Sequence, residues 1–177
     1  MSKILFTLKN LSPYGAPKVV SRHAAALAAG GHEVTIVVGD AATSETGSLE
    51  SELERSGVVV LNQLGLFDQG PSHGFVQVRR LLRKLRPDVV ISSQLRDTPM
   101  VMFAAGTLKI PAIALAQNPL RFTGQSLVAK LKSRVYLESI NWNAAKVVAV
   151  SDFVKDHLRE KSRLAARQIV TVQNGFD

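Results

Sequence analysis

Short runs of apolar residues, with little polar interruption, alternate with amphipathic stretches along this chain. Seven such runs can be read, at residues 4–8, 34–38, 58–61, 89–91, 112–116, 147–150 and 169–172. A run of this length and composition is typical of a strand that is buried on both faces of a parallel sheet. The pattern therefore predicts seven strands.

Helical periodicity fills most of the intervals between these runs. Apolar residues recur every three or four positions in four groups, which are Val20, Ala24 and Leu27; Phe75, Val78, Leu81, Leu82 and Leu85; Leu127, Leu131 and Val135; and Val154 and Leu158. Such stripes are typical of helices that pack on a sheet. A short helix is also expected at 49–55, and Ser151 or Asp152 is expected to cap the last helix.

Strands that alternate with helices predict an α/β fold. We expect one domain over residues 1–177, with a Rossmann-like, doubly wound, mainly parallel sheet of about seven strands and helices on both faces. Ligands of such sheets bind at the carboxyl ends of the strands. Functional residues are therefore expected directly after strands.

Length and composition narrow the class of protein further. A chain of 177 residues without cysteine has no disulfide framework and no thiolate metal site, which suits a reducing compartment. The apolar run at 4–8 is too short for a signal-peptide core, and no eighteen apolar residues run together. A cytoplasmic location is expected.

The charge is strongly positive and clustered. The net charge is +8, and two acid-free clusters contribute to it, namely Arg79, Arg80, Arg83, Lys84 and Arg86, and then Arg121, Lys130, Lys132 and Arg134. Each cluster is either a solvated helix face or a surface for an anionic partner. Aromatic residues make up 6% and do not interleave with these clusters, so no nucleic acid is expected as a partner.

Motifs for common chemistry are mostly missing. No G-x-G-x-x-G follows the first strand and no phosphate loop ends in Gly-Lys-Ser/Thr, which argues against an NAD dehydrogenase and a Walker ATPase. The four histidines lack metal-ligand spacing, so the residues present require no metal. The turn at 10–17 leads into a helix N-terminus and is either a phosphate site around Gly15 and Ala16 or a simple turn.

Residues 70–74 match the G-x-S-x-G pattern of a serine hydrolase, with Asp88 or Asp152 and His157 following in order. A nucleophile elbow needs a strand that leads straight into the serine, whereas the third predicted strand ends several residues earlier. Ser72 is instead expected to cap the next helix. A hydrolase that uses Ser72 remains an alternative function.

A polar cluster follows the fifth predicted strand. Gln117 and Asn118 offer donors and acceptors, and Arg121 offers a fixed positive charge. The cluster is either part of a ligand cleft or a turn built on Asn118 and Pro119.

Several segments together resemble the N-terminal half of family 4 retaining glycosyltransferases of the GT-B fold, over essentially the whole chain. They are 14–17 (YGAP), 31–35 (GHEVT), 86–90 (RPDVV), 109–112 (KIPA), 150–152 (VSD) and 174–177 (NGFD). These are similar to the family's GGAE loop, its GHEV, K/R-P-D and G-I-P strand starts, and its V-S-E and N-G-V-D motifs. Order and spacing, more than any one segment, carry the resemblance.

The resemblance implies one half of a GT-B enzyme, which binds a glycan or lipid-linked acceptor. A C-terminal domain, joined by a hinge at Asn174 and Gly175, would bind a nucleotide-sugar donor, and this chain alone would be inactive. Gly15 and Ala16 would lie on the donor-phosphate side. Residues of the acceptor cleft would be Asn118, Arg121 and Ser151.

Two departures from the family pattern bear on the chemistry. Tyr14 and Pro17 occupy the outer positions of the first loop, and Gln117 stands where the family often has a histidine near the reacting sugar. An amide cannot act as a general acid or base near neutral pH, so Gln117 is expected to hydrogen-bond a sugar.

Because members of this family often act on lipid-linked acceptors, either the basic cluster at 79–86 or the one at 121–134 is expected to hold the protein at the inner face of a membrane. The remaining alternative is a noncatalytic module that binds anions or membranes.

Overall fold

The computed structural model describes residues 1–40, 49–63, 65–67, 70–119 and 127–173. It contains a seven-stranded sheet with the order β3-β2-β1-β4-β5-β6-β7, and all neighbouring strands pair in parallel. The strands are β1 (Lys3–Leu8), β2 (Glu33–Val38), β3 (Val59–Asn62), β4 (Val89–Ser92), β5 (Ala112–Ala116), β6 (Ala144–Ala149) and β7 (Ile169–Thr171). The seven predicted strands and the parallel sheet are confirmed.

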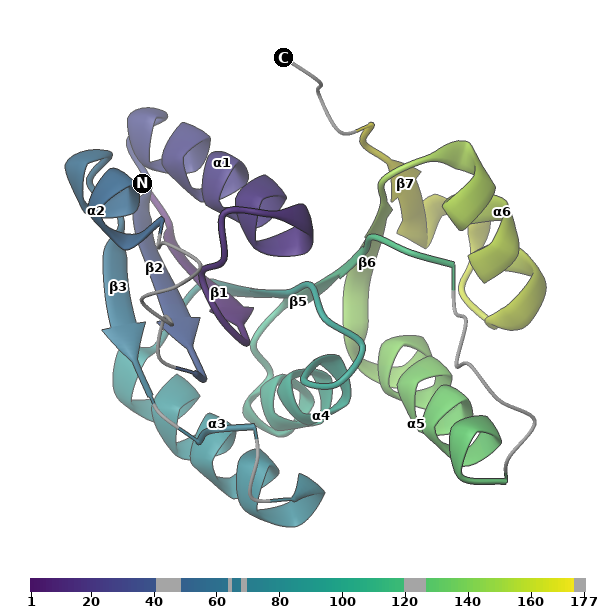
Figure 1. The fold of residues 1–177 in the computed structure, drawn as a ribbon. Helices are drawn as coiled ribbons and strands as arrows, with labels where there is room; N and C mark the ends of the chain where they lie inside the picture. Colours follow the sequence, from purple (N-terminus) through teal and green to yellow (C-terminus); the bar gives the residue numbers. More distant parts are fainter. Residues whose placement is uncertain (41–48, 64, 68–69, 120–126, 174–177) are drawn as a thin grey trace.

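Helices cover both faces of the sheet (Figure 1). The helices are α1 (Gly15–Ala29), α2 (Glu50–Arg55), α3 (Pro71–Leu85), α4 (Thr98–Leu108), α5 (Leu127–Asn143) and α6 (Asp152–Lys161), with a short 3-10 helix at Ala166–Gln168. Buried residues of α1 and α2 pack in one apolar cluster, and those of α3 to α6 pack in the other. The Rossmann-like, doubly wound arrangement is therefore confirmed.

The apolar strands supply both cores. Phe6 and Ile36 are buried in the cluster beneath α1 and α2, whereas Leu5 and Val37 are buried in the cluster beneath α3 to α6. Because successive side chains of a strand point to opposite faces, a strand between two helical layers is apolar at most positions. This requirement explains the uninterrupted runs in the sequence.

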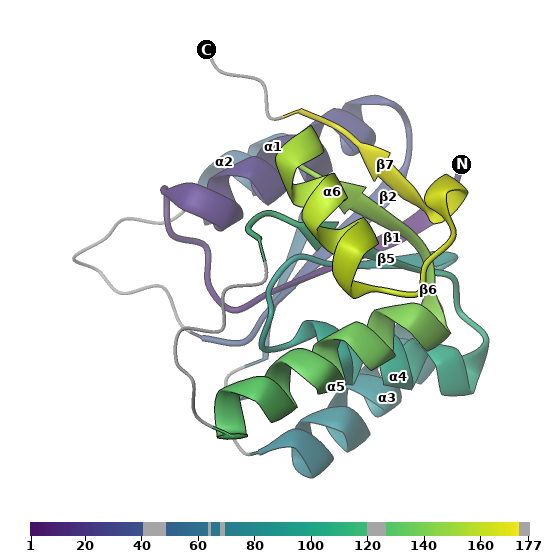
Figure 2. The same cartoon turned by 90° about the vertical axis from the view of Figure 1, so that its right-hand side faces the viewer.

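Helix α4 lies in the middle of the layer formed by α3, α4 and α5 (Figure 1), and Figure 2 shows this layer together on one side of the sheet. Its residues are apolar nearly all round, and Val101, Met102 and Ala105 are fully buried. Two glycines allow the neighbouring helices to approach: a Cβ at Gly74 would lie 2.4 Å from the Met100 sulfur, and one at Gly106 would lie 2.0 Å from Asn143 Oδ1. Both distances are too short for a side chain.

The helix starts agree only in part with the sequence. Ser151 caps α6, because its Oγ accepts a hydrogen bond from Val154 N at 3.3 Å, as predicted. The cap of α3 is Gly70, with φ of +88°, and Ser72 lies inside the first turn. The prediction that Ser72 caps this helix was therefore wrong. The helix already begins at Pro71, so the cap position falls on Gly70, whose positive φ favours glycine over serine.

Helix α5 forms where the sequence predicts a helix, but its apolar stripe does not face the sheet. Leu127 is 83% exposed and Leu131 is 62% exposed, and Val135 is exposed as well. Tyr136, Ser139 and Ile140 are buried instead. The expectation that the stripe packs on the sheet was wrong, because residues one position further along the helix make that contact.

Candidate functional site

The strand order reverses between β1 and β4, and this switch point is where open parallel sheets bind ligands. Two loops meet at the carboxyl ends of these strands. The backbone N–H of Lys9, after β1, donates to Oε1 of Gln94, after β4, at 3.1 Å. The bond holds the two loops together at the switch point.

A cavity of about 170 Å³ opens at this point of the sheet. Its lining comes from the first turn of α1, the ends of β4 and β5 with the loops that follow, and the inner face of α5. The lining residues are Ala16, Ser93, Gln94, Leu95, Leu115, Ala116, Gln117, Asn118 and Tyr136. All of these described side chains are uncharged near pH 7, including the tyrosine, whose hydroxyl is protonated there.

Two polar groups of the lining are buried without a partner among the described residues. They are the hydroxyl oxygen of Ser93, a residue that is 7% exposed, and Nε2 of Gln117. A buried polar atom that forms no hydrogen bond costs roughly 1–3 kcal/mol, so each group favours a polar ligand atom or a water as its partner. The cavity is therefore built to receive hydrogen-bonding atoms.

Asp97 lies beneath the switch point, between the ends of β1 and β4, and is 1% exposed. Its Oδ2 accepts a hydrogen bond from Thr7 Oγ1 at 3.3 Å, and its Oδ1 has no partner among the described residues. Burial raises the pKa of Asp97 to about 7, although hydrogen bonds such as the one from Thr7 act in the opposite direction. The carboxyl group is thus largely protonated below neutral pH.

Tyr136 reaches the cavity from α5 and is fully buried. Burial raises the pKa of its hydroxyl above the ordinary value, and the nearby Asp97 carboxylate adds to the increase. The hydroxyl therefore stays protonated and serves as a hydrogen-bond donor or acceptor, while the ring provides an apolar surface.

The N-terminus of α1 lies beside the cavity, since Ala16 is in its first turn and lines the cavity. The N-cap residue, Tyr14, makes no capping hydrogen bond through its side chain, which is exposed. Gly15 has φ of +60°, a conformation that favours glycine. The free N–H groups and the helix dipole at this end favour an anion.

The other predicted site residues are divided in their placement. Asn118 lines the cavity beside Gln117. Ser151 caps α6 through its hydroxyl and is not among the cavity residues. Arg121, Asn174 and Gly175 lie outside the described residues.

The serine hydrolase geometry is not formed. Ser72 is exposed in the first turn of α3, and His157 belongs to α6. Helices α3 and α6 lie well apart in both ribbon views, with α4 and α5 between them (Figures 1 and 2). A nucleophile and its base must lie within hydrogen-bond reach, so Ser72 and His157 do not form a catalytic pair.

Within the described part of the chain, no three His, Cys, Asp or Glu side chains gather as a metal site would require. None of the described helices is both long and apolar enough to cross a bilayer.

Sequence reasoning missed Ser93, Asp97 and Tyr136. Ser93 directly follows β4, so the rule that ligands bind at strand ends was the available signal for it. No comparable signal exists for Tyr136, because its approach to the cavity depends on how α5 rotates against the sheet.

The parallel sheet, with its polar cavity at the switch point, defines a Rossmann-like α/β domain of the kind found in GT-B glycosyltransferases. The chain belongs to Glycosyltransferase Family 4, whose family model matches residues 13–177. The resemblance inferred from the sequence motifs is thereby confirmed.

Solved structures share this fold at low sequence identity. The Anabaena protein Alr3699/HepE in complex with UDP and glucose has a TM-score of 0.76 and 18% identity, with 100% of this chain and 45% of that chain covered. A UDP-GlcNAc 2-epimerase from Methanocaldococcus jannaschii has a TM-score of 0.59 and 14% identity, with coverages of 97% and 45%. The chain spans less than half the length of these proteins.

One curated relative is similar over a shorter segment. It is the UDP-N-acetylglucosamine--N-acetylmuramyl-(pentapeptide) pyrophosphoryl-undecaprenol N-acetylglucosamine transferase of Halothermothrix orenii, and 64 residues are 39% identical. The match covers 36% of this chain and 17% of the relative.

Proposed function

We propose that this chain is the acceptor-binding half of a retaining glycosyltransferase, whose donor nucleotide sugar is bound by a second, C-terminal domain. The cavity at the β1/β4 switch point carries this proposal, because its uncharged polar groups and its apolar wall match the hydroxyls and the ring of a sugar. Family membership supports transfer as the reaction.

Each group around the cavity has a role in the proposal. The amide of Gln117 hydrogen-bonds a sugar near the reacting centre without transferring a proton. Asn118 orients the acceptor at the cavity, and Arg121 and Ser151 are assigned to the acceptor from the family resemblance alone. The N–H groups of Gly15 and Ala16 face the donor diphosphate, which suits the positive end of the α1 dipole.

The donor is proposed to be a UDP sugar, and the acceptor a glycan or a lipid-linked sugar. A crystal structure of the similar HepE protein contains UDP-glucose, and the name of the Halothermothrix relative includes a pyrophosphoryl-undecaprenol acceptor. The epimerase neighbours share the fold without being transferases by name, so family membership and the cavity carry more weight than the fold.

A transfer assay tests the proposal. The complete protein, incubated with UDP-glucose, UDP-galactose or UDP-N-acetylglucosamine and a set of glycoside acceptors, is expected to release UDP and form a new glycoside. Residues 1–177 alone are expected to form none, since the donor site is assigned to the second domain. Absence of transfer with every pair would favour a noncatalytic binding module, and transfer by residues 1–177 alone would overturn the division of roles.

We further propose that this domain lies on the inner face of an anionic membrane through α5. The outward face of α5 exposes Leu127, Val128, Leu131, Val135 and Trp142, and Lys130, Lys132 and Arg134 are exposed along the same helix. Apolar residues bordered by cations are typical of a helix that lies in the headgroup region. Each nearby cation adds about 1 kcal/mol of attraction to an anionic leaflet.

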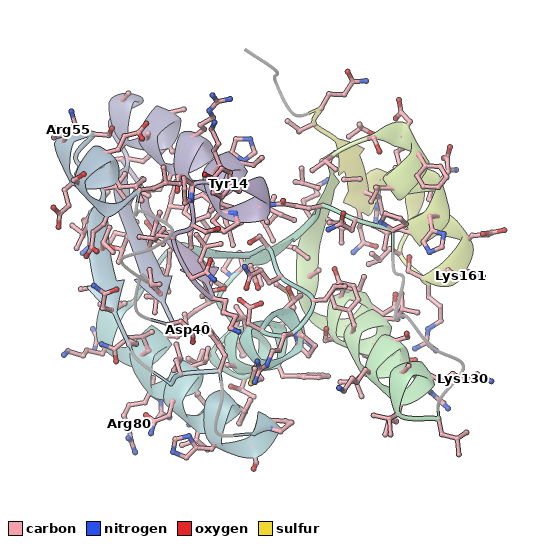
Figure 3. All side chains as sticks on the ribbon, in the orientation of Figure 1. Tyr14, Asp40, Arg55, Arg80, Lys130 and Lys161 are labelled. Carbon is pink, nitrogen blue, oxygen red and sulfur yellow. The ribbon has the colours of Figure 1, made fainter. Side chains whose placement is uncertain are left out.

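The other basic cluster, at 79–86, belongs to the same helical layer. Arg80 and Lys130 point outward from α3 and α5 (Figure 3). In that cluster, however, Arg79 donates to Thr107 Oγ1 at 3.1 Å and Arg80 donates to Gln77 Oε1 at 3.3 Å. We therefore assign the main contact to α5 and a weaker, electrostatic one to α3.

Vesicle flotation measures this contact. Leu127→Ser with Leu131→Ser is expected to weaken binding to vesicles of phosphatidylglycerol and phosphatidylcholine by about tenfold, because two exposed side chains no longer insert. The matched control is Val59→Ser, which removes one exposed apolar side chain from β3, outside both proposed contacts. Equal flotation of the double variant and the parent protein, or equal binding to neutral vesicles, would contradict the assignment.

A further inference from the structure

The cavity at the switch point contains a second recognition group that the family motifs do not include. Ser93 follows β4 directly, and its side chain is buried at the cavity wall without a hydrogen-bond partner among the described residues. The neighbouring Ser92 differs, because its Oγ lies 2.9 Å from Thr98 Oγ1 and is thereby satisfied. Ser92 therefore stabilises the start of α4, whereas the hydroxyl of Ser93 is available to a ligand in the cavity.

Ser93 and Gln117 complement each other chemically. A serine hydroxyl both donates and accepts, whereas the Nε2 group of Gln117 only donates. A ligand that satisfies both must offer at least one acceptor oxygen and one further oxygen that donates or accepts. A pair of neutral hydroxyl groups on one ring meets this requirement.

The surroundings disfavour an anion inside the cavity. Among the residues that the structure describes, none of the side chains lining the cavity is a lysine, arginine or histidine. Asp97 lies behind the wall and becomes negative as the pH rises, so it would repel a phosphate or carboxylate more strongly above neutral pH. The positive end of α1 lies at the rim, beside Ala16, where a diphosphate can remain outside the cavity.

The size of the cavity sets a further limit. Its volume of about 170 Å³ is smaller than the roughly 300–1,000 Å³ of pockets for drug-sized ligands. It therefore accommodates a single ring and not a whole oligosaccharide. Apolar surface for such a ring comes from Leu95, Leu115 and Tyr136.

We propose that Ser93 is a specificity-determining residue, which binds a neutral, hydroxylated sugar unit together with Gln117 and excludes anionic units. The assignment of this sugar unit to the acceptor rests on the proposed function. Binding of the sugar ring requires no transfer reaction. Binding at Ser93 and sugar transfer can therefore be tested separately.

Saturation-transfer NMR of the complete protein with methyl glycosides of glucose, galactose and N-acetylglucosamine tests the proposal. We expect at least one glycoside to bind, and Ser93→Ala to weaken its binding about three- to tenfold, the range for one lost neutral hydrogen bond. Ser56→Ala is the matched control, because Ser56 lies at the end of α2 and is not a cavity residue, and its Oγ donates to the backbone oxygen of Glu52 at 2.9 Å. It is expected to bind as the parent protein does.

A competition experiment tests the exclusion of anions. Inorganic phosphate and glucose 6-phosphate are expected not to displace the neutral glycoside. Displacement by either one, an unchanged affinity of Ser93→Ala, or no binding of any glycoside would each overturn the proposal. Binding that depends on Ser93 in a protein without transferase activity would instead retain the proposal and refute the proposed reaction.

Discussion

Replacing Gln117 by alanine in the complete protein is expected to lower kcat for sugar transfer on the order of a hundredfold, the effect of losing one donor near developing charge. Gln117 follows β5 at the cavity, and its Nε2 is buried without a partner among the described residues. Since an amide cannot move a proton, the loss should be nearly independent of pH between 6 and 8.

The rate of UDP release, measured at a series of acceptor concentrations, gives kcat and KM separately for the variant and the parent protein. Gln63→Ala serves as the control, because Gln63 is exposed just after β3 and is not a cavity residue. It is expected to keep the parent rate. An unchanged kcat for Gln117→Ala would remove this residue from the site, and a strongly pH-dependent loss would contradict its role as a hydrogen-bond donor.

The free energy of unfolding is expected to fall as the pH rises from about 4 to about 7, because of Asp97. Its pKa is raised to about 7 in the folded protein from an ordinary value of 3.8, so the folded state keeps a proton that the unfolded state loses. Stability is lost wherever the folded state binds more protons. The loss is on the order of 4 kcal/mol over this window, since each pKa unit corresponds to about 1.4 kcal/mol.

Asp97→Asn removes this titration while conserving the shape of the side chain. In urea denaturation at several pH values, the parent protein is expected to lose unfolding free energy between pH 4 and pH 8. The variant is expected not to show this loss, so its stability relative to the parent protein rises by the same amount. Asp156→Asn, at an exposed acid on α6, is the control and should follow the parent curve. Parallel curves for Asp97→Asn and the parent protein would mean that Asp97 is already charged in the folded state.

The sheet could be predicted from the sequence because its strands are buried on both faces. Residues such as Phe6 and Leu5 must be apolar whichever helical layer they face, and this produces runs that are easily recognised. Helix α4 was not identified by an apolar stripe, because a helix buried between two others is apolar on nearly all sides.

The orientation of α5 was predicted wrongly for a related reason. Leu127, Leu131 and Val135 recur at helical spacing and were expected to form the inner face, but they face outward. Helical periodicity identifies an apolar face of a helix, but it does not determine whether the sheet or another surface contacts that face. The same three residues are now the basis of the proposed membrane contact.

The candidate site was predicted in part. Gln117 and Asn118 were found because they directly follow a strand, and the structure places both at the cavity with Ala16. Ser93 and Asp97 were missed, since a serine and an aspartate after a strand are common and only burial distinguishes them. Burial depends on the packing of distant segments, which a local pattern does not contain.

Acceptor binding at the cavity of the β1/β4 switch point underlies the proposed function. A crystal structure of the complete protein with UDP and a methyl glycoside that supports transfer tests it most directly. We expect a sugar ring in the cavity, with its hydroxyl groups within hydrogen-bond distance of Gln117 Nε2 and Ser93 Oγ. A glycoside bound elsewhere, with the cavity filled by water or by the nucleotide, would contradict it.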